Sequence, residues 1–196
     1  MSSNLVMQAA VGLLAVTSVM LLISRDWRYS LAALGCQYIG VALLVSMQWP
    51  VGMALIKLVV GWMTGATLGF TQFSVKDRGE ETSWPRGWVF RLGAAALVML
   101  VVFSVVPQMS TWLTTVSPPQ VEGGLLLLAM GLLQLGMTAK PFRVILGLLT
   151  FLSGFEIIYS AVEVSILVAG LLAAVNLSLA LVGTYLIAYS SAEKSP

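Results

Sequence analysis

Residues 92–113, LGAAALVMLVVFSVVPQMSTWL, form a run of 22 residues without a charged side chain. A helix rises about 1.5 Å per residue, so this run can cross the roughly 30 Å hydrocarbon core of a bilayer. The stretch therefore predicts a transmembrane helix, with Pro107 near its end.

Six further apolar runs surround this one. Whole-chain composition agrees with them, because 59% of the residues are hydrophobic and only 9% are charged, whereas soluble domains carry about 25% charged residues. This excludes a soluble enzyme, a disordered segment and a nucleic-acid-binding protein. We expect an all-α integral membrane protein, residues 1–196, in one polytopic domain. Its seven transmembrane helices should cover about 5–24, 29–49, 51–75, 92–113, 123–139, 142–162 and 164–190.

The charged loop residues predict the orientation of these spans. With seven spans, nine of the ten Lys and Arg residues fall on one side: Arg25, Arg28, Lys76, Arg78, Arg86, Arg91, Lys140, Arg143 and Lys194. The other side holds only Glu122 and Glu163. Cytoplasmic loops are enriched in Lys and Arg, so we expect the N-terminus outside, the loop 76–91 and the C-terminus in the cytoplasm, and the chain in the cell's inner (cytoplasmic) membrane. No Lys or Arg precedes Arg25, so the first run is expected to be a retained helix rather than a signal peptide.

Few side chains are suited to catalysis or metal binding. The chain has no histidine and one cysteine, Cys36, which removes the common metal ligands and the usual activated nucleophiles. We expect no catalytic residue, no metal site and no cofactor in this chain alone. Whether it belongs to an enzyme as a non-catalytic subunit stays open.

Two ionisable residues lie inside predicted spans. Lys57 is six residues into the third span and Glu156 is six residues from the end of the sixth, so both lie about 9 Å below the outer boundary. Such residues usually face the bundle interior and often mark ion paths. Opposite charges at matching depth can pair, either in an ion path or as a static salt bridge. Lys57 could instead snorkel towards the headgroups.

Neutral polar residues accompany this pair. Asn176 lies near the middle of the seventh span and Gln37 lies in the second. We take both as candidates for a proton path, with an interhelical hydrogen bond as the alternative, which is favoured for Asn176. The spacing of Gly61, Gly65 and Gly69 predicts close helix packing, within the chain or against another subunit.

Several short stretches resemble hydrogenase-4 component E, a membrane subunit of group 4 hydrogenases. Leu34-Gly-Cys-Gln37 is similar to a Cys-Gln stretch of that family, Ile56-Lys57-Leu-Val-Val60 to its lysine in the third helix, and Phe142-Arg143-Val-Ile-Leu-Gly147 to the start of its sixth helix. The last three helices of the family are similar to the complex I K subunit and the Mrp antiporter C subunit. The sequence departs from the family where Leu152 and Asn176 stand at acidic positions, and Glu156 comes one turn after the first of these.

The resemblance implies a subunit in the membrane arm of a proton- or sodium-translocating complex. Its partners would be antiporter-like and connecting membrane subunits and lipid, with no nucleic acid. A purely structural linker subunit is the alternative. A stand-alone transporter or scramblase ranks third, because no convincing inverted repeat or pair of discontinuous helices is present.

Overall fold

A computed structural model describes residues 2–74 and 87–192 of the chain. All regular structure in these ranges is helical: α1 (Ser2–Ile23), α2 (Trp27–Val45), α3 (Val51–Ser74), α4 (Trp88–Trp112), α5 (Pro118–Met137), α6 (Pro141–Val162) and α7 (Ile166–Ala192). Each contains 19 to 27 residues apolar enough to cross a membrane. The prediction of seven spans is confirmed, and the chain is a multi-pass membrane protein. Most of the predicted loop 76–91 lies outside the described residues.

Two helices begin four or five residues (92 − 88 and 123 − 118) before the starts that the hydropathy of the sequence suggested. α4 starts at Trp88, before Arg91, and continues through Pro107 to Trp112. α5 starts at Pro118 rather than Gly123, because proline suits the first turn of a helix, where its missing N–H is not needed. Hydropathy alone places such polar first turns in loops.

The first turn of α5 is fixed by side-chain hydrogen bonds. Ser117 and Gln120 form a capping box, in which the backbone N–H of Ser117 donates to Gln120 Oε1 at 3.3 Å. The Ser117 hydroxyl donates to the same oxygen at 2.8 Å. Gln120 Nε2 donates to the carbonyl of Leu44 at 3.0 Å. These contacts attach the start of α5 to the end of α2.

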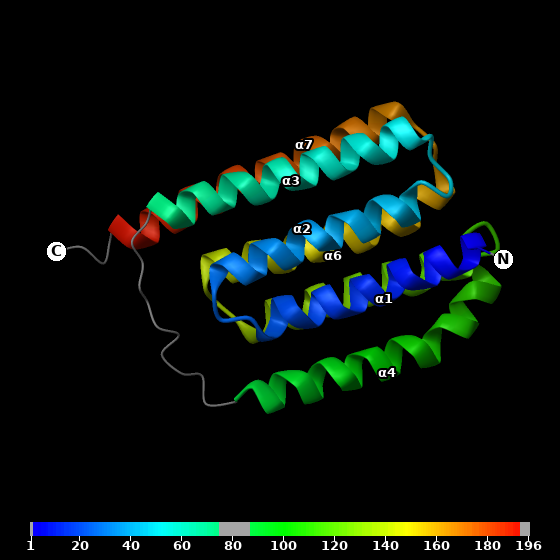
Figure 1. The fold of residues 1–196 in the computed structure, drawn as a ribbon, viewed down its shortest axis with the longest axis horizontal. Helices are drawn as coiled ribbons and strands as arrows, with labels where there is room; N and C mark the ends of the chain where they lie inside the picture. Colours follow the sequence, from blue (N-terminus) through cyan, green and yellow to red (C-terminus); the bar gives the residue numbers. More distant parts are fainter. Residues whose placement is uncertain (1, 75–86, 193–196) are drawn as a thin grey trace.

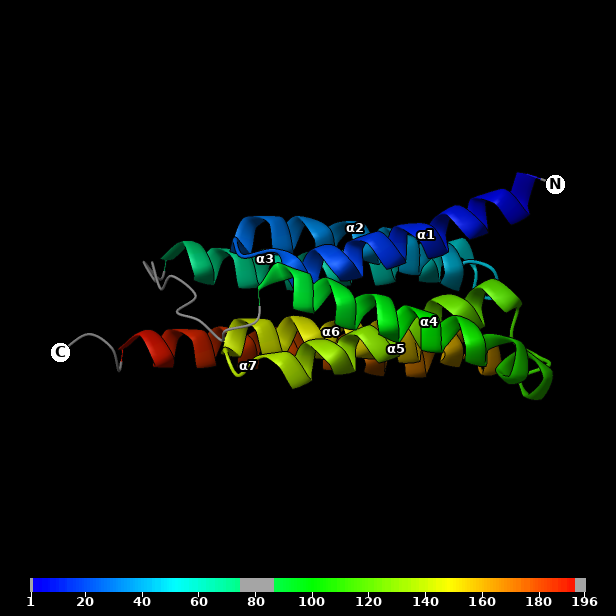
Figure 2. The same cartoon turned by 90° about the horizontal axis from the view of Figure 1, so that it is seen from below.

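The helices form two layers and a flanking helix. α1, α2 and α3 make one layer and α5, α6 and α7 the other, as Figure 2 shows from the side. Each helix of the first layer packs against the helix in the same place of the second: α1 on α5, α2 on α6 and α3 on α7. In Figure 1 the two layers therefore overlap, while α4 lies along the edge formed by α1 and α5.

The closest backbone approach joins α5 to α6. A Cβ added at Gly131 would lie 2.6 Å from the backbone nitrogen of Phe151, and one added at Gly154 would lie 2.6 Å from that of Leu128. No side chain fits at such distances, so these glycines let the two backbones touch. The sequence analysis did not single out either position.

Apolar side chains cover most of the outside of the bundle. α4 buries only Ala95 and Val102, and large side chains such as Phe70, Phe73 and Trp112 are more than 70% exposed. A surface of this kind suits lipid or neighbouring membrane subunits rather than water.

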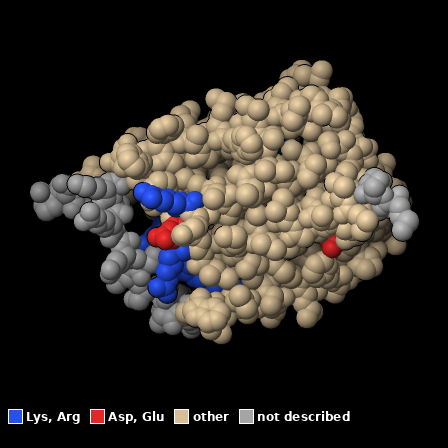
Figure 3. Space-filling view, in the orientation of Figure 1, with Lys and Arg blue, Asp and Glu red and all other residues tan. Residues whose placement is uncertain are grey.

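Charged residues gather at the two ends of the bundle (Figure 3). The end where α2, α4 and α6 begin carries Arg25, Asp26, Arg28, Arg91, Lys140 and Arg143 among the described residues, and the opposite end carries Glu122 and Glu163. We call the first of these the basic end. Only Lys57 and Glu156, among the described Asp, Glu, Lys and Arg residues, lie deep between the ends.

Candidate functional site

Lys57 lies on the buried face of α3. That face consists of Ala54, Lys57, Gly61, Thr64 and Leu68, which recur at helical spacing. The Lys57 residue is 6% exposed. Its ammonium group is therefore directed into the bundle and does not snorkel along the helix surface.

Glu156 on α6 is the partner of Lys57. The Lys57 Nζ atom and Glu156 Oε2 form an ion pair, and Glu156 is 3% exposed. The matching depths of the two residues allowed this pairing, and the structure brings them into direct contact. A carboxylate and an ammonium in contact stabilise each other where water is excluded, whereas either one alone would be costly.

Asn176 on α7 holds the other oxygen of the carboxylate. Its Nδ2 atom donates to Glu156 Oε1 at 3.0 Å, and Asn176 is fully buried. Both oxygens of Glu156 are thus engaged, one by Lys57 and one by Asn176. The interhelical hydrogen bond that was the alternative interpretation of Asn176 is present, and it leads directly to the buried charge.

Tyr38 on α2 extends this network and was missed by the sequence analysis. Its hydroxyl donates to Asn176 Oδ1 at 3.3 Å, and the side chain is 1% exposed. A tyrosine in the middle of a span is the available signal, because tyrosines of membrane helices concentrate at the interfaces. Tyr38, Lys57, Glu156 and Asn176, here called the buried network, join α2, α3, α6 and α7 across the two layers.

The buried network occupies one level of the bundle. Lys57 is six residues from the start of α3, and Glu156 is six residues from the end of α6. Tyr38 is seven residues from the end of α2, and Asn176 is ten residues from the start of α7. At about 1.5 Å per residue, all four lie roughly 9–15 Å below the end opposite the basic end.

This arrangement can exchange protons without changing its net charge. A carboxylate beside an ammonium and a carboxylic acid beside an amine carry the same total charge, so a proton can pass between Lys57 and Glu156 at small electrostatic cost. Hydroxyl and amide groups such as Tyr38 and Asn176 orient such a pair by hydrogen bonds. The site is therefore suited to holding and transferring a proton.

Gln37 is buried beside this network without joining it. It is 1% exposed, and neither of its amide atoms has a hydrogen-bond partner among the described residues. The hydroxyl of Thr64, fully buried on α3, also has none there. Unpaired buried groups of this kind are usual places for ordered water.

The three glycines of α3 differ in their surroundings. A Cβ at Gly61 would lie 2.3 Å from ring atoms of Tyr38, whereas one at Gly65 would have no atom within 4 Å. A Cβ at Gly69 would reach Leu31 at 3.1 Å. Gly61 and Gly69 therefore both face α2, whereas the position between them has no close neighbour there. Within the part of the chain that the structure describes, Gly65 is not a packing position.

Two arginines at the basic end serve a structural purpose that the sequence analysis did not foresee. Arg143 on α6 donates from Nη1 to the carbonyl of Leu21 at 3.0 Å and from Nη2 to the carbonyl of Ser24. Arg91 on α4 donates from Nη1 to the carbonyl of Leu22 at 3.1 Å. The last carbonyls of a helix lack intrahelical partners and carry partial negative charge, so these arginines cap α1.

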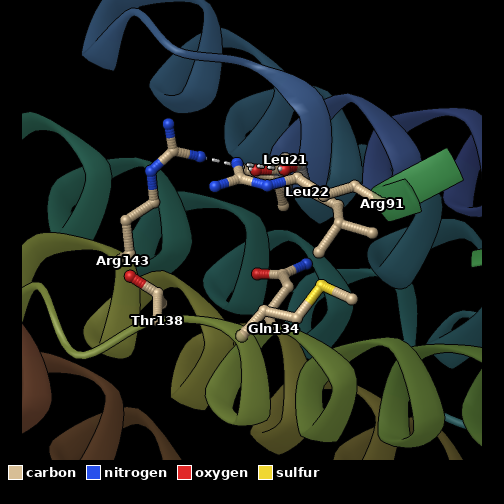
Figure 4. Close-up of a pocket in the computed structure, with 7 residues that line it drawn as sticks. Leu21, Leu22, Arg91, Gln134, Thr138 and Arg143 are labelled. Carbon is tan, nitrogen blue, oxygen red and sulfur yellow. Dashed lines mark hydrogen bonds between the residues drawn. The ribbon is translucent and has the colours of Figure 1, made fainter. Parts of the chain in front are cut away.

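A small pocket lies beside these caps (Figure 4). Its lining residues are Leu21, Leu22, Arg91, Gln134, Met137, Thr138 and Arg143, and its volume is ≈ 20 Å³. Gln134 is 5% exposed, and its Nε2 atom has no hydrogen-bond partner among the described residues. The pocket is far along the bundle from the buried network, at the other end of α6 from Glu156.

Metal ligands do not cluster in the part of the chain that the structure describes: no group of three or more His, Cys, Asp and Glu side chains there could hold an ion. Cys36 is exposed on α2.

No family model, curated protein or solved structure matches this chain.

Proposed function

We propose that this chain is a membrane-arm subunit of a multi-subunit complex that translocates protons or sodium ions. In this proposal Lys57 and Glu156 hold the transferred charge, and Asn176 and Tyr38 orient the carboxylate. The single observation that carries the proposal is the buried network itself. Ionisable groups within membrane spans are costly and usually mark ion or proton pathways.

Other features of the chain fit this assignment. The local similarity to hydrogenase-4 component E includes Lys57, which lies in the buried network. Gln37 and Thr64 add buried polar atoms that have no hydrogen-bond partner among the described residues, near the middle of the bundle, where water could extend a proton path. Because its sequence has no histidine and only one cysteine to hold an electron carrier, we expect such a subunit to take its driving energy from antiporter-like and redox partners.

Orientation and location form part of the same proposal. The basic end faces the cytoplasm, because Lys and Arg are enriched in cytoplasmic loops. α1 then begins outside, α7 ends inside, and the buried network lies nearer the outer surface of the inner (cytoplasmic) membrane. The exposed apolar faces of α3, α4 and α7 contact lipid and the neighbouring membrane subunits.

The experiment that tests this function compares two variants in the assembled complex. The complex is purified from its native membrane through a tag on this chain, reconstituted in liposomes, and assayed for ion uptake with a pH-sensitive dye or a sodium tracer. Glu156→Gln keeps an amide oxygen that can accept from Lys57, so enough complex should assemble for the assay, and ion uptake should be abolished. The matched control, Glu122→Gln at the end of the bundle, should retain it.

A structural linker subunit is the second candidate, and one observation favours it. Both oxygens of Glu156 already have partners within the chain, as expected of a static brace between layers. Normal ion uptake by an assembled Glu156→Gln complex would establish this alternative. Purification of the chain without antiporter-like or redox subunits would contradict both candidate functions. It would favour a stand-alone transporter or scramblase.

A further inference from the structure

We propose that the pocket at the basic end, between α1, α4, α5 and α6, binds a phosphate-bearing anion, namely the headgroup of an anionic phospholipid (Figure 4). This site lies apart from the buried network. The proposed lipid binding therefore does not depend on ion transfer at Glu156, and the two are tested separately.

The charge around the pocket favours an anion. Two guanidinium groups, those of Arg91 and Arg143, line it, and their bonds to the carbonyls of α1 fix them in place. Arg25, Arg28 and Lys140 lie at the same end, where Asp26 is the one acidic residue among those described. A guanidinium carries five N–H donors in a rigid fork, which matches phosphate oxygens well.

Gln134 gives the pocket a hydrogen-bond donor that has no acceptor among the described residues. In Figure 4 its amide group lies below the guanidinium of Arg91. The residue is 5% exposed and its Nε2 atom lacks a partner among the described residues. A buried N–H group without an acceptor costs free energy. An oxygen atom from outside the chain would satisfy it, and the hydroxyl of Thr138, which also lines the pocket, is a further donor.

The depth of the pocket matches the phosphate level of a membrane. Arg91 is three residues from the start of α4, Arg143 is two from the start of α6, and Gln134 is three from the end of α5. At about 1.5 Å per residue, these positions lie within roughly 5 Å of the helix ends, where headgroups begin. Basic pockets between transmembrane helices on the cytoplasmic side are typical sites for anionic headgroups.

The size and the remaining walls fit part of a lipid rather than a whole free ion. The volume of ≈ 20 Å³ accommodates about one water-sized group. One phosphate oxygen can therefore enter, while the rest of the headgroup stays at the mouth. Of the apolar residues in the lining, Leu21 and Leu22 are buried and Met137 is partly exposed, so Met137 can contact the beginning of an acyl chain. Inorganic phosphate shares the charge but would not make this contact.

The test measures lipid binding to the full chain in neutral detergent micelles. Phosphatidylglycerol, phosphatidylcholine and inorganic phosphate are titrated separately, and bound ligand is counted by native mass spectrometry. Gln134→Glu places a carboxylate in the pocket and should weaken phosphatidylglycerol binding about tenfold or more, through loss of a donor and added repulsion. Lys140→Gln removes a charge at the same end but outside the pocket lining, and should change the affinity about twofold at most.

Arg91→Gln repeats the test if Gln134→Glu does not fold, with folding judged by circular dichroism. Binding of phosphatidylglycerol over phosphatidylcholine, lost in either pocket variant and kept in Lys140→Gln, supports the lipid site. Variant-dependent binding of inorganic phosphate without lipid selectivity supports the anion site but assigns it to a free anion. Equal binding of all ligands, or equal losses in the control and the pocket variants, overturns the proposal.

Discussion

The ring of Tyr38 occupies the space that a side chain at Gly61 would need. A Cβ built on Gly61 would lie 2.3 Å from two ring carbons of Tyr38. This contact between α2 and α3 sets the height of the phenol, whose hydroxyl donates to Asn176. A glycine on one helix thus positions a hydrogen bond that reaches a third helix.

We expect Gly61→Ala to displace Tyr38 and to destabilise the protein by about 1–3 kcal/mol, the usual cost of an overpacked core. Denaturant unfolding in micelles, followed by circular dichroism, measures the change. Gly65→Ala is the matched control on the same helix, because a Cβ there meets nothing within 4 Å. It should not destabilise the protein, and the higher helix propensity of alanine should stabilise it by at most about 0.5–1 kcal/mol. Equal effects of the two variants would show that Gly61 does not position Tyr38.

Removing one member of the ion pair should be far more harmful than removing both. Lys57→Met or Glu156→Leu leaves the other charge buried without its partner, and each should cost about 3–5 kcal/mol. The double variant should recover most of this loss and should assemble normally. A double-mutant cycle on the free energy of unfolding measures the coupling. Additive effects would contradict a direct pair.

Recovered assembly also separates the two candidate functions. A double variant that assembles without ion uptake supports an ion path through Lys57 and Glu156. A double variant that regains both assembly and uptake supports a static brace.

Asn176 should matter more than Tyr38, because it lies between Tyr38 and the carboxylate. Tyr38→Phe removes the bond to Asn176 and leaves both partners of the carboxylate in place, and such bonds in membrane bundles are worth about 0.6 kcal/mol on average. Asn176→Leu also removes a partner of buried Glu156 Oε1 and should cost about 1–3 kcal/mol. Unfolding in micelles ranks the two variants. The reverse order would mean that Lys57 alone satisfies the carboxylate.

The cap on α1 should require an arginine at position 143. Arg143 reaches the carbonyls of Leu21 and Ser24 with two different nitrogens, and a lysine has only one. Arg143→Lys should therefore destabilise the protein by about 1 kcal/mol or more, despite keeping the charge. The control Arg28→Lys, on an exposed side chain, should have little effect. Thermal unfolding in micelles compares them, and equal stabilities would remove the capping interpretation.

Cysteine labelling tests the orientation of the bundle. In a background with Cys36→Ala, a cysteine replacing Thr115 should react with a membrane-impermeant maleimide added outside intact cells. One replacing Ser83, which lies outside the described residues, should react only after the membrane is opened. The opposite pattern would place the basic end outside and refute the orientation.

Hydropathy and charge placement were enough to predict the seven spans. Each span must by itself be long and apolar enough to cross the bilayer, whichever helices pack against it. The depths of Lys57 and Glu156 also came from counting, since a helix converts residue number into height. The layer pairing of α2 with α6 and α3 with α7 depends on side-chain fit between distant segments. Tyr38 joined the candidate site only once that pairing was known.

Two further features lay beyond sequence patterns for separate reasons. The spacing of Gly61, Gly65 and Gly69 suggests one packing face, but among the described residues only Gly61 and Gly69 closely approach α2. The side chains that α2 places opposite each glycine decide this fit. Arg143 fits the charge bias of a loop equally well as a free side chain or as a cap. Only the position of the end of α1 beside α6 distinguishes these two interpretations.

The separation of the ion pair along the chain has a consequence for biosynthesis. Glu156 follows Lys57 by 99 residues (156 − 57), so the ribosome, at about 5–20 residues per second, needs roughly 5–20 s between them. During that interval the nascent α3 holds a cation that costs about 2.5–3.5 kcal/mol within lipid. Synthesis of α6 supplies Glu156 and ends this exposure. A chain truncated before α6 would keep an unpaired Lys57 within the membrane, a defect that membrane quality control can recognise.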